Sequence, residues 1–208
     1  MPRISKEESR ARRDEIIDSC AALYRTENYH DITMSHIAKG VSFGRANIYN
    51  YFQCKDEIML ALLQREHELW ADDLDALAAQ VGRLDDEQLA DGLATSLQAR
   101  EQMLKLLAMN LYDMEQNSRL ENLIQLKHAY GRVIASLQGL LAGAKPGWDQ
   151  ARIDRFTFGF MPFLHGVYPY AFHTRKQTEA MEAVGVAKPG MSLHEMVRTL
   201  ALQLLEAD

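Results

Sequence analysis

The side chains best suited to recognition chemistry are clustered between positions 45 and 50. This short segment carries four hydrogen-bonding side chains: Arg45, Asn47, Tyr49 and Asn50. Arg and Asn form paired hydrogen bonds with base edges in the DNA major groove, and Tyr adds a ring and a hydroxyl. Ile48 and Phe52 are four residues apart and would share one apolar helical face. The segment therefore predicts either a helix that reads DNA or a helix with an ordinary solvated face.

The residues on either side predict the elements that position this segment. Ile37 and Ala38 would lie at the centre of a short helix, with Thr33 as its N-cap. The turn between Gly40 and Gly44 contains two glycines, which tolerate positive φ angles. A longer helix is expected to begin at Cys54, where Lys55 opposes the helix dipole. An unfavourable cation at a helix start indicates a functional role.

This order of residues resembles the helix-turn-helix of the tetracycline-repressor (TetR) family. That family typically reads IA-x-x-x-G-V-S-x-G-x-x-Y-x-Y-F-x-x-K-E-x-L. The chain departs from the pattern in the turn, where Gly-Val-Ser begins two residues early at Gly40 and Gly44 takes the usual serine position. The resemblance is sharp over about residues 12–58. The positions that match in type and spacing are Ile37, Ala38, Tyr49, Tyr51, Phe52, Lys55 and Glu57.

The resemblance implies an all-α protein in which a long helix joins two domains. A three-helix DNA-binding domain is expected at residues 1–56, and an effector-binding and dimerisation domain at residues 57–208. In that family the lysine that corresponds to Lys55 contacts a DNA phosphate. We expect the operator to be contacted by Thr33, Arg45, Ala46, Asn47, Tyr49, Asn50, Tyr51 and Lys55. Ser42 and Gly44 are both candidates for the cap of the recognition helix.

Composition and charge favour a protein that touches DNA at one end. The 208-residue chain has a net charge of -6, which argues against general coating of nucleic acid. Residues 1–55 carry nine Lys/Arg and seven Asp/Glu, whereas the remainder carries fourteen and twenty-two. Its two cysteines form no disulfide framework, and the N-terminus does not read as a signal peptide. No apolar run approaches the ~18 residues of a membrane span, so we expect a cytoplasmic protein with no membrane partner.

Helical periodicity extends along nearly the whole chain. Pro162 and Pro169 are expected to kink or split the segment Asp149–Arg175, which is apolar on two sides. Capping boxes are read at Ser118–Glu121 and Ser192–Glu195. A dimer is expected, with Phe158, Met161, Leu200 and Leu204 at its interface. The other expected helices are Ser9–Thr26, Cys54–Ala79, Asp85 or Asp86 to before Arg100, Glu101–Met109, Ser118–Leu141 and Ser192–Glu206.

The sequence gives little support to an enzyme. It contains no GxSxG, P-loop or GxGxxG motif, and its seven histidines include no HExxH. We expect no cofactor and no metal. Two non-enzyme hypotheses remain: a dimeric, ligand-controlled repressor of a palindromic operator, and an architectural or accessory DNA-binding protein without an effector. The resemblance favours the repressor.

An effector pocket is expected among the predicted helical segments Glu101–Met109, Ser118–Leu141 and Asp149–Arg175, above the long helix that begins near Lys55. Asn110, Tyr130 and His165 are the polar groups able to orient a ligand. Because no Arg or Lys falls among the candidates, the effector is expected to be a neutral or cationic, lipophilic molecule. The apolar walls are expected to be Met103, Leu107, Met114, Leu123, Leu126, Tyr130, Phe156 and Phe160.

Overall fold

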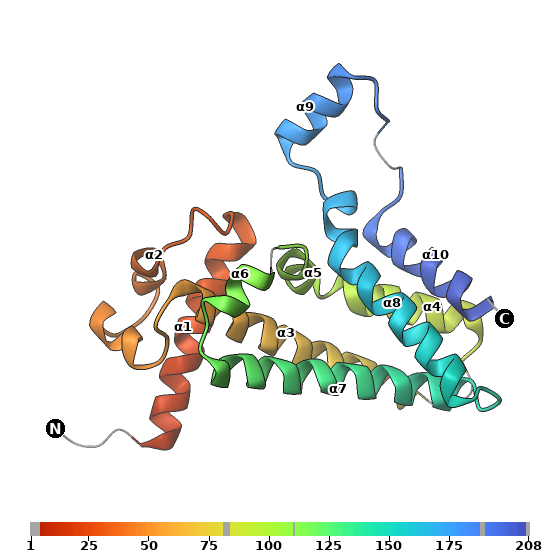
Figure 1. The fold of residues 1–208 in the computed structure, drawn as a ribbon, viewed down its shortest axis with the longest axis horizontal. Coiled ribbons are helices and arrows are strands. Elements are labelled where there is room, and N and C mark those ends of the chain that lie inside the picture. The colour runs from red at the N-terminus through yellow and green to blue at the C-terminus, as the bar shows by residue number, and fades with distance from the viewer. Residues whose placement is uncertain (1–4, 81–83, 110, 188–189, 207–208) are drawn as a thin grey trace. The chain divides into compact units, whose positions relative to one another are not determined.

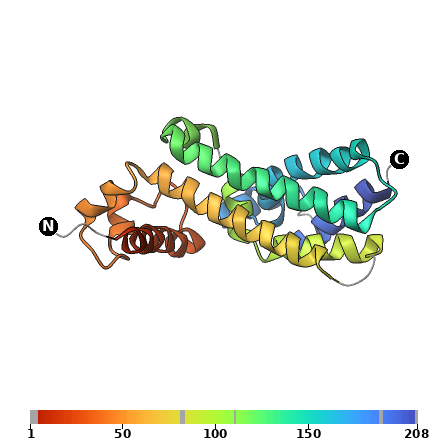
Figure 2. The ribbon, with the colours of Figure 1, turned by 90° about the horizontal axis from the view of Figure 1, so that it is seen from below.

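The computed structural model describes residues 5–80, 84–109, 111–187 and 190–206, and these contain helices but no strand. The chain forms two compact units (Figures 1 and 2). Residues 1–65 and 110–129 make up the first, and residues 66–109 and 130–208 the second. The helices are α1 (Lys6–Thr26), α2 (Met34–Ala38), η1 (Arg45–Asn50), α3 (Lys55–Ala78), α4 (Asp86–Gln98), α5 (Glu101–Leu107), α6 (Leu111–Gln116), α7 (Leu120–Ala144), α8 (Gln150–Ala171), α9 (Arg175–Ala183) and α10 (Leu193–Glu206).

The first unit is built on a small apolar core beneath α1, α2 and η1. Thr33 caps α2 as expected, because its hydroxyl accepts the backbone N–H of His36 at 3.2 Å. Ser5 caps α1, so that helix begins three residues before the expected Ser9. Cys20 is an inert core residue whose thiol lies 3.7 Å from the Met59 sulfur. The core side chains include Ile16, Ile17, Cys20, Tyr24, Ile37, Ile48 and Phe52.

The turn between α2 and η1 differs from the expectation in its use of glycine. Among the described residues only Gly185 has a positive φ, so Gly40 and Gly44 were not selected for left-handed backbone. Glycine is required at position 40 because the backbone there passes too close to α1 to leave room for a side chain. A Cβ at that position would lie 2.3 Å from the hydroxyl oxygen of Ser19 on α1. A Cβ on Gly44 would meet nothing within 4 Å.

The second unit packs α10 against α4 and α8, and α5 against α8 (Figure 1). Trp70 on α3 is fully buried and donates its indole N–H to the Ser96 hydroxyl at 3.0 Å. The capping box at Ser192 is confirmed, because Glu195 accepts the Ser192 N–H at 2.7 Å and the Ser192 hydroxyl accepts the Glu195 N–H at 3.2 Å. The predicted apolar face of α3 is buried along its length.

Of the two effects expected of Pro162 and Pro169, a kink or a split, the split does not occur, since α8 is continuous from Gln150 to Ala171. Proline removes one i→i−4 hydrogen bond, which leaves the carbonyl four residues earlier without its helical donor. Here the two prolines and the residues four positions before them, Phe158 and His165, are all exposed. Water can therefore satisfy both carbonyls.

The sequence analysis missed two helices and placed the start of a third incorrectly. Neither α6 nor α9 was expected, and α9 has no buried residue from which an apolar stripe could be read. Its signal is the capping box of Thr174 and Gln177. The predicted cap at Ser118 is wrong, because α7 begins only at Leu120. The Ser118 hydroxyl donates to the Met114 carbonyl of α6 at 2.7 Å. The first residue to accept α7 backbone bonds is Arg119.

Candidate nucleic-acid interface

The predicted recognition helix is η1, and it is a 3₁₀ helix, not the α-helix that we expected. Ile48 and Phe52 are buried and anchor it to the core of the first unit. A 3₁₀ helix has three residues per turn, so side chains at i and i+3 eclipse each other. This winding aligns Ala46 with Tyr49 and Asn47 with Asn50. The exposed residues of η1 are Arg45, Ala46, Asn47, Tyr49 and Asn50.

The exposed row is partly preorganised by its own hydrogen bond. Arg45 Nη2 donates to the Tyr49 hydroxyl at 3.3 Å, so the guanidinium and the phenol lie together above the helix. The helix begins at Arg45, and the residue before it, Gly44, supplies no side-chain cap. Ser42 does not serve as a cap either, since its N–H and hydroxyl both donate to the Glu15 carboxylate. Neither of the two cap candidates therefore caps η1 with a side chain.

The predicted phosphate-contacting residues lie at the edges of this surface. Thr33 is exposed at the start of α2, and Tyr51 is half-buried against the Phe43 ring. Lys55 is also half-buried: its Nζ donates to the Tyr29 carbonyl at 2.6 Å and lies 3.8 Å from the centre of the Tyr29 ring. Burial lowers the pKa of this ammonium, and the neighbouring Asp56 carboxylate opposes that shift. Lys55 therefore has a structural anchor inside the unit.

The structure also identifies residues that sequence reasoning missed, at the corner between α6 and α7. Arg119 Nε donates to Glu57 Oε1 at 2.6 Å and Arg119 Nη2 to Glu57 Oε2 at 2.9 Å. The same Nη2 donates to the Tyr51 carbonyl at 3.0 Å, one residue past the end of η1. Next to it, Asn117 Nδ2 donates to Asp56 Oδ2 at 2.8 Å. No sequence signal finds these pairs, because their members lie 61 to 68 residues apart.

Glu57 is the buried end of this network. Its side chain is 1% exposed, and it also accepts the backbone N–H of Gln53 at 2.7 Å and that of Arg119 at 3.2 Å. Burial alone raises the pKa of a carboxyl, but the hydrogen bonds from Arg119 and Gln53 outweigh it and lower the Glu57 pKa. The hydrogen bond with Glu57 raises the pKa of Arg119. The pair is therefore charged and closely held.

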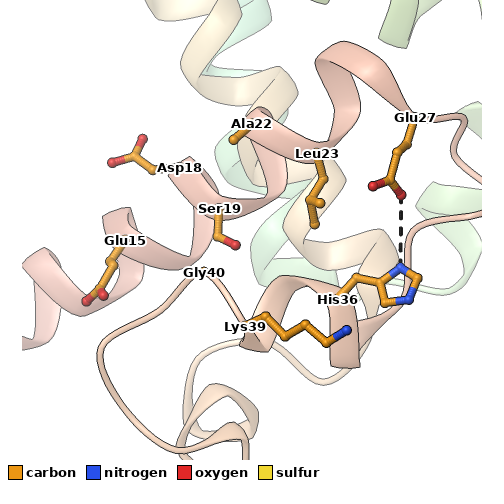
Figure 3. Close-up of a pocket in the computed structure, with 9 residues that line it drawn as sticks. All are labelled: Glu15, Asp18, Ser19, Ala22, Leu23, Glu27, His36, Lys39 and Gly40. Atoms are coloured by element: carbon orange, nitrogen blue, oxygen red, sulfur yellow. Dashed lines mark ion pairs between the residues drawn. The ribbon is translucent and has the colours of Figure 1, made fainter.

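A groove of about 620 Å³ lies between α1 and α2 in the same unit (Figure 3). Figure 3 shows Gly40 directly beneath Ser19, which is the close approach that excludes a Cβ. Two acidic groups of the groove already have partners: Glu27 lies 4.0 Å from His36, and Asp18 pairs with Arg65. None of the residues predicted to contact DNA or effector lines it.

The residues predicted to line an effector pocket are divided between the two units. Met114, Leu123 and Leu126 belong to the first. In the second, α5 contributes buried Met103 and Leu107, and α8 contributes Phe156 and Phe160, whose rings stack at 5.6 Å. Tyr130 is half-buried, with its ring 6.0 Å from that of buried His67, a neighbour that we did not predict. His165 is exposed on α8, and Asn110 lies outside the described residues.

Sequence families account for nearly the whole chain. Residues 16–62 match the model described as bacterial regulatory proteins, tetR family. Residues 64–206 match the tetracyclin repressor-like C-terminal domain. The chain belongs to the TetR family. It is therefore a DNA-binding transcriptional regulator and not an enzyme, and the all-α organisation expected from the sequence is confirmed.

Solved structures of TetR-type regulators have the same fold. The fatty acid degradation regulator FadR from Bacillus halodurans matches with a TM-score of 0.60 and 19% identity over 94% of this chain and 95% of that one. A TetR transcriptional regulator from Rhodococcus sp. RHA1 matches with a TM-score of 0.56 and 13% identity over 96% and 98% of the two chains. At these identities the likeness shows the fold alone. No curated protein matches the chain.

The residues that the structure describes show neither a metal cluster nor a membrane span. They contain no group of three or more His, Cys, Asp or Glu side chains placed to hold a metal ion. No helix within them has the length and apolarity that crossing a membrane requires.

Proposed function

We propose that this TetR-family regulator is a repressor that binds a palindromic operator as a homodimer and is released by a small lipophilic effector. DNA binding is assigned to residues 1–56, and effector binding and dimerisation to residues 57–208. The observation that carries the proposal is the exposed row of polar side chains on η1, backed by buried Ile48 and Phe52. A rigid apolar backing with hydrogen-bonding groups outward is what readout of base edges requires.

The predicted contacts divide into two classes. Arg45, Asn47 and Tyr49 reach base edges, with Ala46 and Asn50 alongside, whereas Thr33, Tyr51 and Lys55 hold phosphates. Base contacts select the sequence, and phosphate contacts position the protein without selecting. One recognition helix spans only a few base pairs. A twofold dimer places two such helices about 34–36 Å apart, or a multiple of that, so that both half-sites of a palindrome are read.

In vitro selection of binding sites from random DNA tests the proposal, followed by affinity measurements on the selected and random duplexes. Arg45→Ala is expected to cost about 1–3 kcal/mol on the selected site and much less on random DNA. Lys55→Ala is expected to weaken both alike. Arg175→Ala is the charge-matched control, since Arg175 is 93% exposed on α9 and pairs only locally with Glu179. Failure of the wild type to enrich any sequence would refute the proposal.

The effector half of the proposal is tested separately. Thermal melting of the full chain against a library of neutral and cationic lipophilic compounds should reveal ligands that raise the Tm and release the selected DNA. A typical coupling of ~1–3 kcal/mol lowers operator affinity about 5–150-fold. Tyr130→Ala and Phe156→Leu should abolish that response while DNA binding persists. Tyr170→Ala, at an exposed tyrosine of α8, should leave it intact. An unchanged response in both test variants would place the pocket elsewhere.

A further inference from the structure

Arg119 connects two elements that a DNA-reading surface must keep in register. Its guanidinium bonds at once to the carbonyl of Tyr51, at the end of η1, and to the carboxylate of Glu57, in the first turn of α3. A 3₁₀ helix leaves its last carbonyls without helical donors. The Tyr51 carbonyl receives its donor from Arg119, 68 residues away in the sequence.

The corner that carries Arg119 is itself fixed on both sides. The Arg119 carbonyl accepts the first backbone N–H groups of α7, from Asn122 and Leu123. Ser118 closes α6 through the Met114 carbonyl, and Lys127 on α7 pairs with Glu115 on α6 at 2.8 Å. Asn117 binds Asp56 with its amide and accepts the Cys54 thiol with its carbonyl at 3.5 Å. Residues 117–119 therefore hold the segment from Tyr51 to Glu57 through several hydrogen bonds.

We infer that Arg119 is a positioning residue for DNA recognition, and that the α6–α7 corner sets the orientation of η1. The inference rests on the proposed DNA-reading role of η1. Arg119 is not itself one of the predicted DNA contacts, and the match to the tetR-family regulatory model ends at residue 62. Because α7 begins at Leu120, directly after Arg119, the start of that helix is tied to the end of η1 through a single side chain. Paired bidentate bonds between Arg and a buried carboxylate are stiff and directional, which suits such a link.

The same helix offers a matched control. Arg132 on α7 pairs with Asp72 and Asp75 on α3, and its side chain is 44% exposed against 41% for Arg119. Arg132 and its partners all lie in the second unit. Arg119→Met, at the residue before α7, and Arg132→Met, within α7, each remove one positive charge and one ion-pair network.

The test compares both variants with the wild type on DNA selected by the wild-type protein and on random duplex. Arg119→Met is expected to lower affinity for the selected DNA about tenfold or more, with random DNA changed less than about twofold. Arg132→Met should leave both unchanged. Arg119→Lys keeps the charge but cannot bridge both acceptors in the same way, so it should recover only part of the loss. A selected-DNA affinity within about twofold of wild type for Arg119→Met would overturn the inference.

Loss of Arg119 also leaves the Glu57 carboxylate buried without its cation, which could unfold the unit. The double variant Arg119→Met/Glu57→Gln removes that charge while still offering an oxygen to the Gln53 N–H. It should fold, and yet retain the loss of selected-DNA affinity. Full recovery of affinity in this variant would show that Arg119 serves only to neutralise Glu57.

Hydrogen exchange supplies a readout that needs no DNA. In the double variant, exchange is expected to rise for the peptide amides of residues 45–53 while those of α1 stay protected. Equal exchange in the two proteins, or a general rise that includes α1, would overturn the positioning role. If the wild type selected no DNA at all, the proposed function would fail, whereas this exchange experiment would still decide the role of Arg119.

Discussion

Gly40 provides the sharpest test of how the first unit is packed. A methyl group at this position would lie 2.3 Å from Ser19 Oγ and 3.0 Å from Ser19 Cβ. Ser19 cannot easily give way, because it is buried and its hydroxyl donates to the Ile37 carbonyl at 2.8 Å. Gly40→Ala therefore forces α1 and α2 apart or breaks that hydrogen bond.

The cost follows from two contributions. Overpacking of a close contact costs about 1–3 kcal/mol, and loss of the Ser19–Ile37 hydrogen bond costs about 1 kcal/mol. Together they amount to roughly 2–4 kcal/mol of unfolding free energy. For a chain of this size, each kcal/mol lowers the Tm by about 2–4 °C, so a drop of roughly 4–16 °C is expected. Differential scanning calorimetry and urea unfolding measure both quantities.

Gly44→Ala is the matched control, since a Cβ there meets nothing within 4 Å and the backbone is extended at φ −64. Its effect should stay within about 0.5 kcal/mol. Replacing Ser19 by glycine should relieve the clash, so Gly40→Ala should cost at least ~1 kcal/mol less in a Ser19→Gly background. If Gly40→Ala were as stable as Gly44→Ala, the close approach of α1 and α2 would be wrong.

Three further outcomes are expected. The pKa of Glu57 is lower in the folded state, so its charge stabilises the fold above the unfolded pKa of about 4.3, and this stabilisation is lost as pH falls through the folded pKa. Glu57→Gln should therefore flatten the acid side of a curve of Tm against pH. An unchanged slope would argue against the charged pair. Burial raises the pKa of Cys20 to about 12, so its thiol should react with an alkylating agent at pH 8 only when the chain unfolds. Half-buried Cys54 should be labelled first, which mass spectrometry can detect. Early labelling of Cys20 would contradict its place in the core. Phe158 is 58% exposed on α8, so Phe158→Glu should convert the dimer to a monomer in sedimentation experiments. Tyr112→Glu, at an exposed residue of α6, should leave the dimer intact. A stable Phe158→Glu dimer would place the interface elsewhere.

Local sequence signals predicted most of the helices because each signal acts within a few residues. Thr33 and Ser192 cap the helices that they were expected to cap, and the apolar face of α3 is buried. Ser118 precedes a glutamate by three residues, as Ser192 does, yet its hydroxyl donates to the Met114 carbonyl of α6, a helix that was not expected. A capping pattern alone cannot show which of two adjacent helix ends will use the side chain.

The site was predictable where the contacts are exposed and sequential, and not where they are buried and distant. The outward residues of η1 follow from the pattern around Ile48 and Phe52. The 3₁₀ winding does not follow from it, because its tighter hydrogen bonds depend on what the helix packs against. Arg119 and Asn117 were missed since their partners lie more than 60 residues away. Met161, predicted for the dimer interface, is buried in the chain's own second unit at 3% exposure, so it cannot also cover a partner.

The network around Glu57 limits how this regulator can be rebuilt from parts. A chimera that joins the first 62 residues to the body of another regulator would carry the carboxylate but leave behind the guanidinium at position 119. The transplanted segment would then hold a buried carboxylate without its cation, and breaking a buried ion pair in this way typically destabilises a fold by more than about 3 kcal/mol. If Arg119 positions η1 as we infer, the part that must be moved intact is discontinuous: it consists of the N-terminal segment together with the α6–α7 corner. An exchange of specificity between such proteins has to move both pieces, or supply an arginine of equal reach in the recipient.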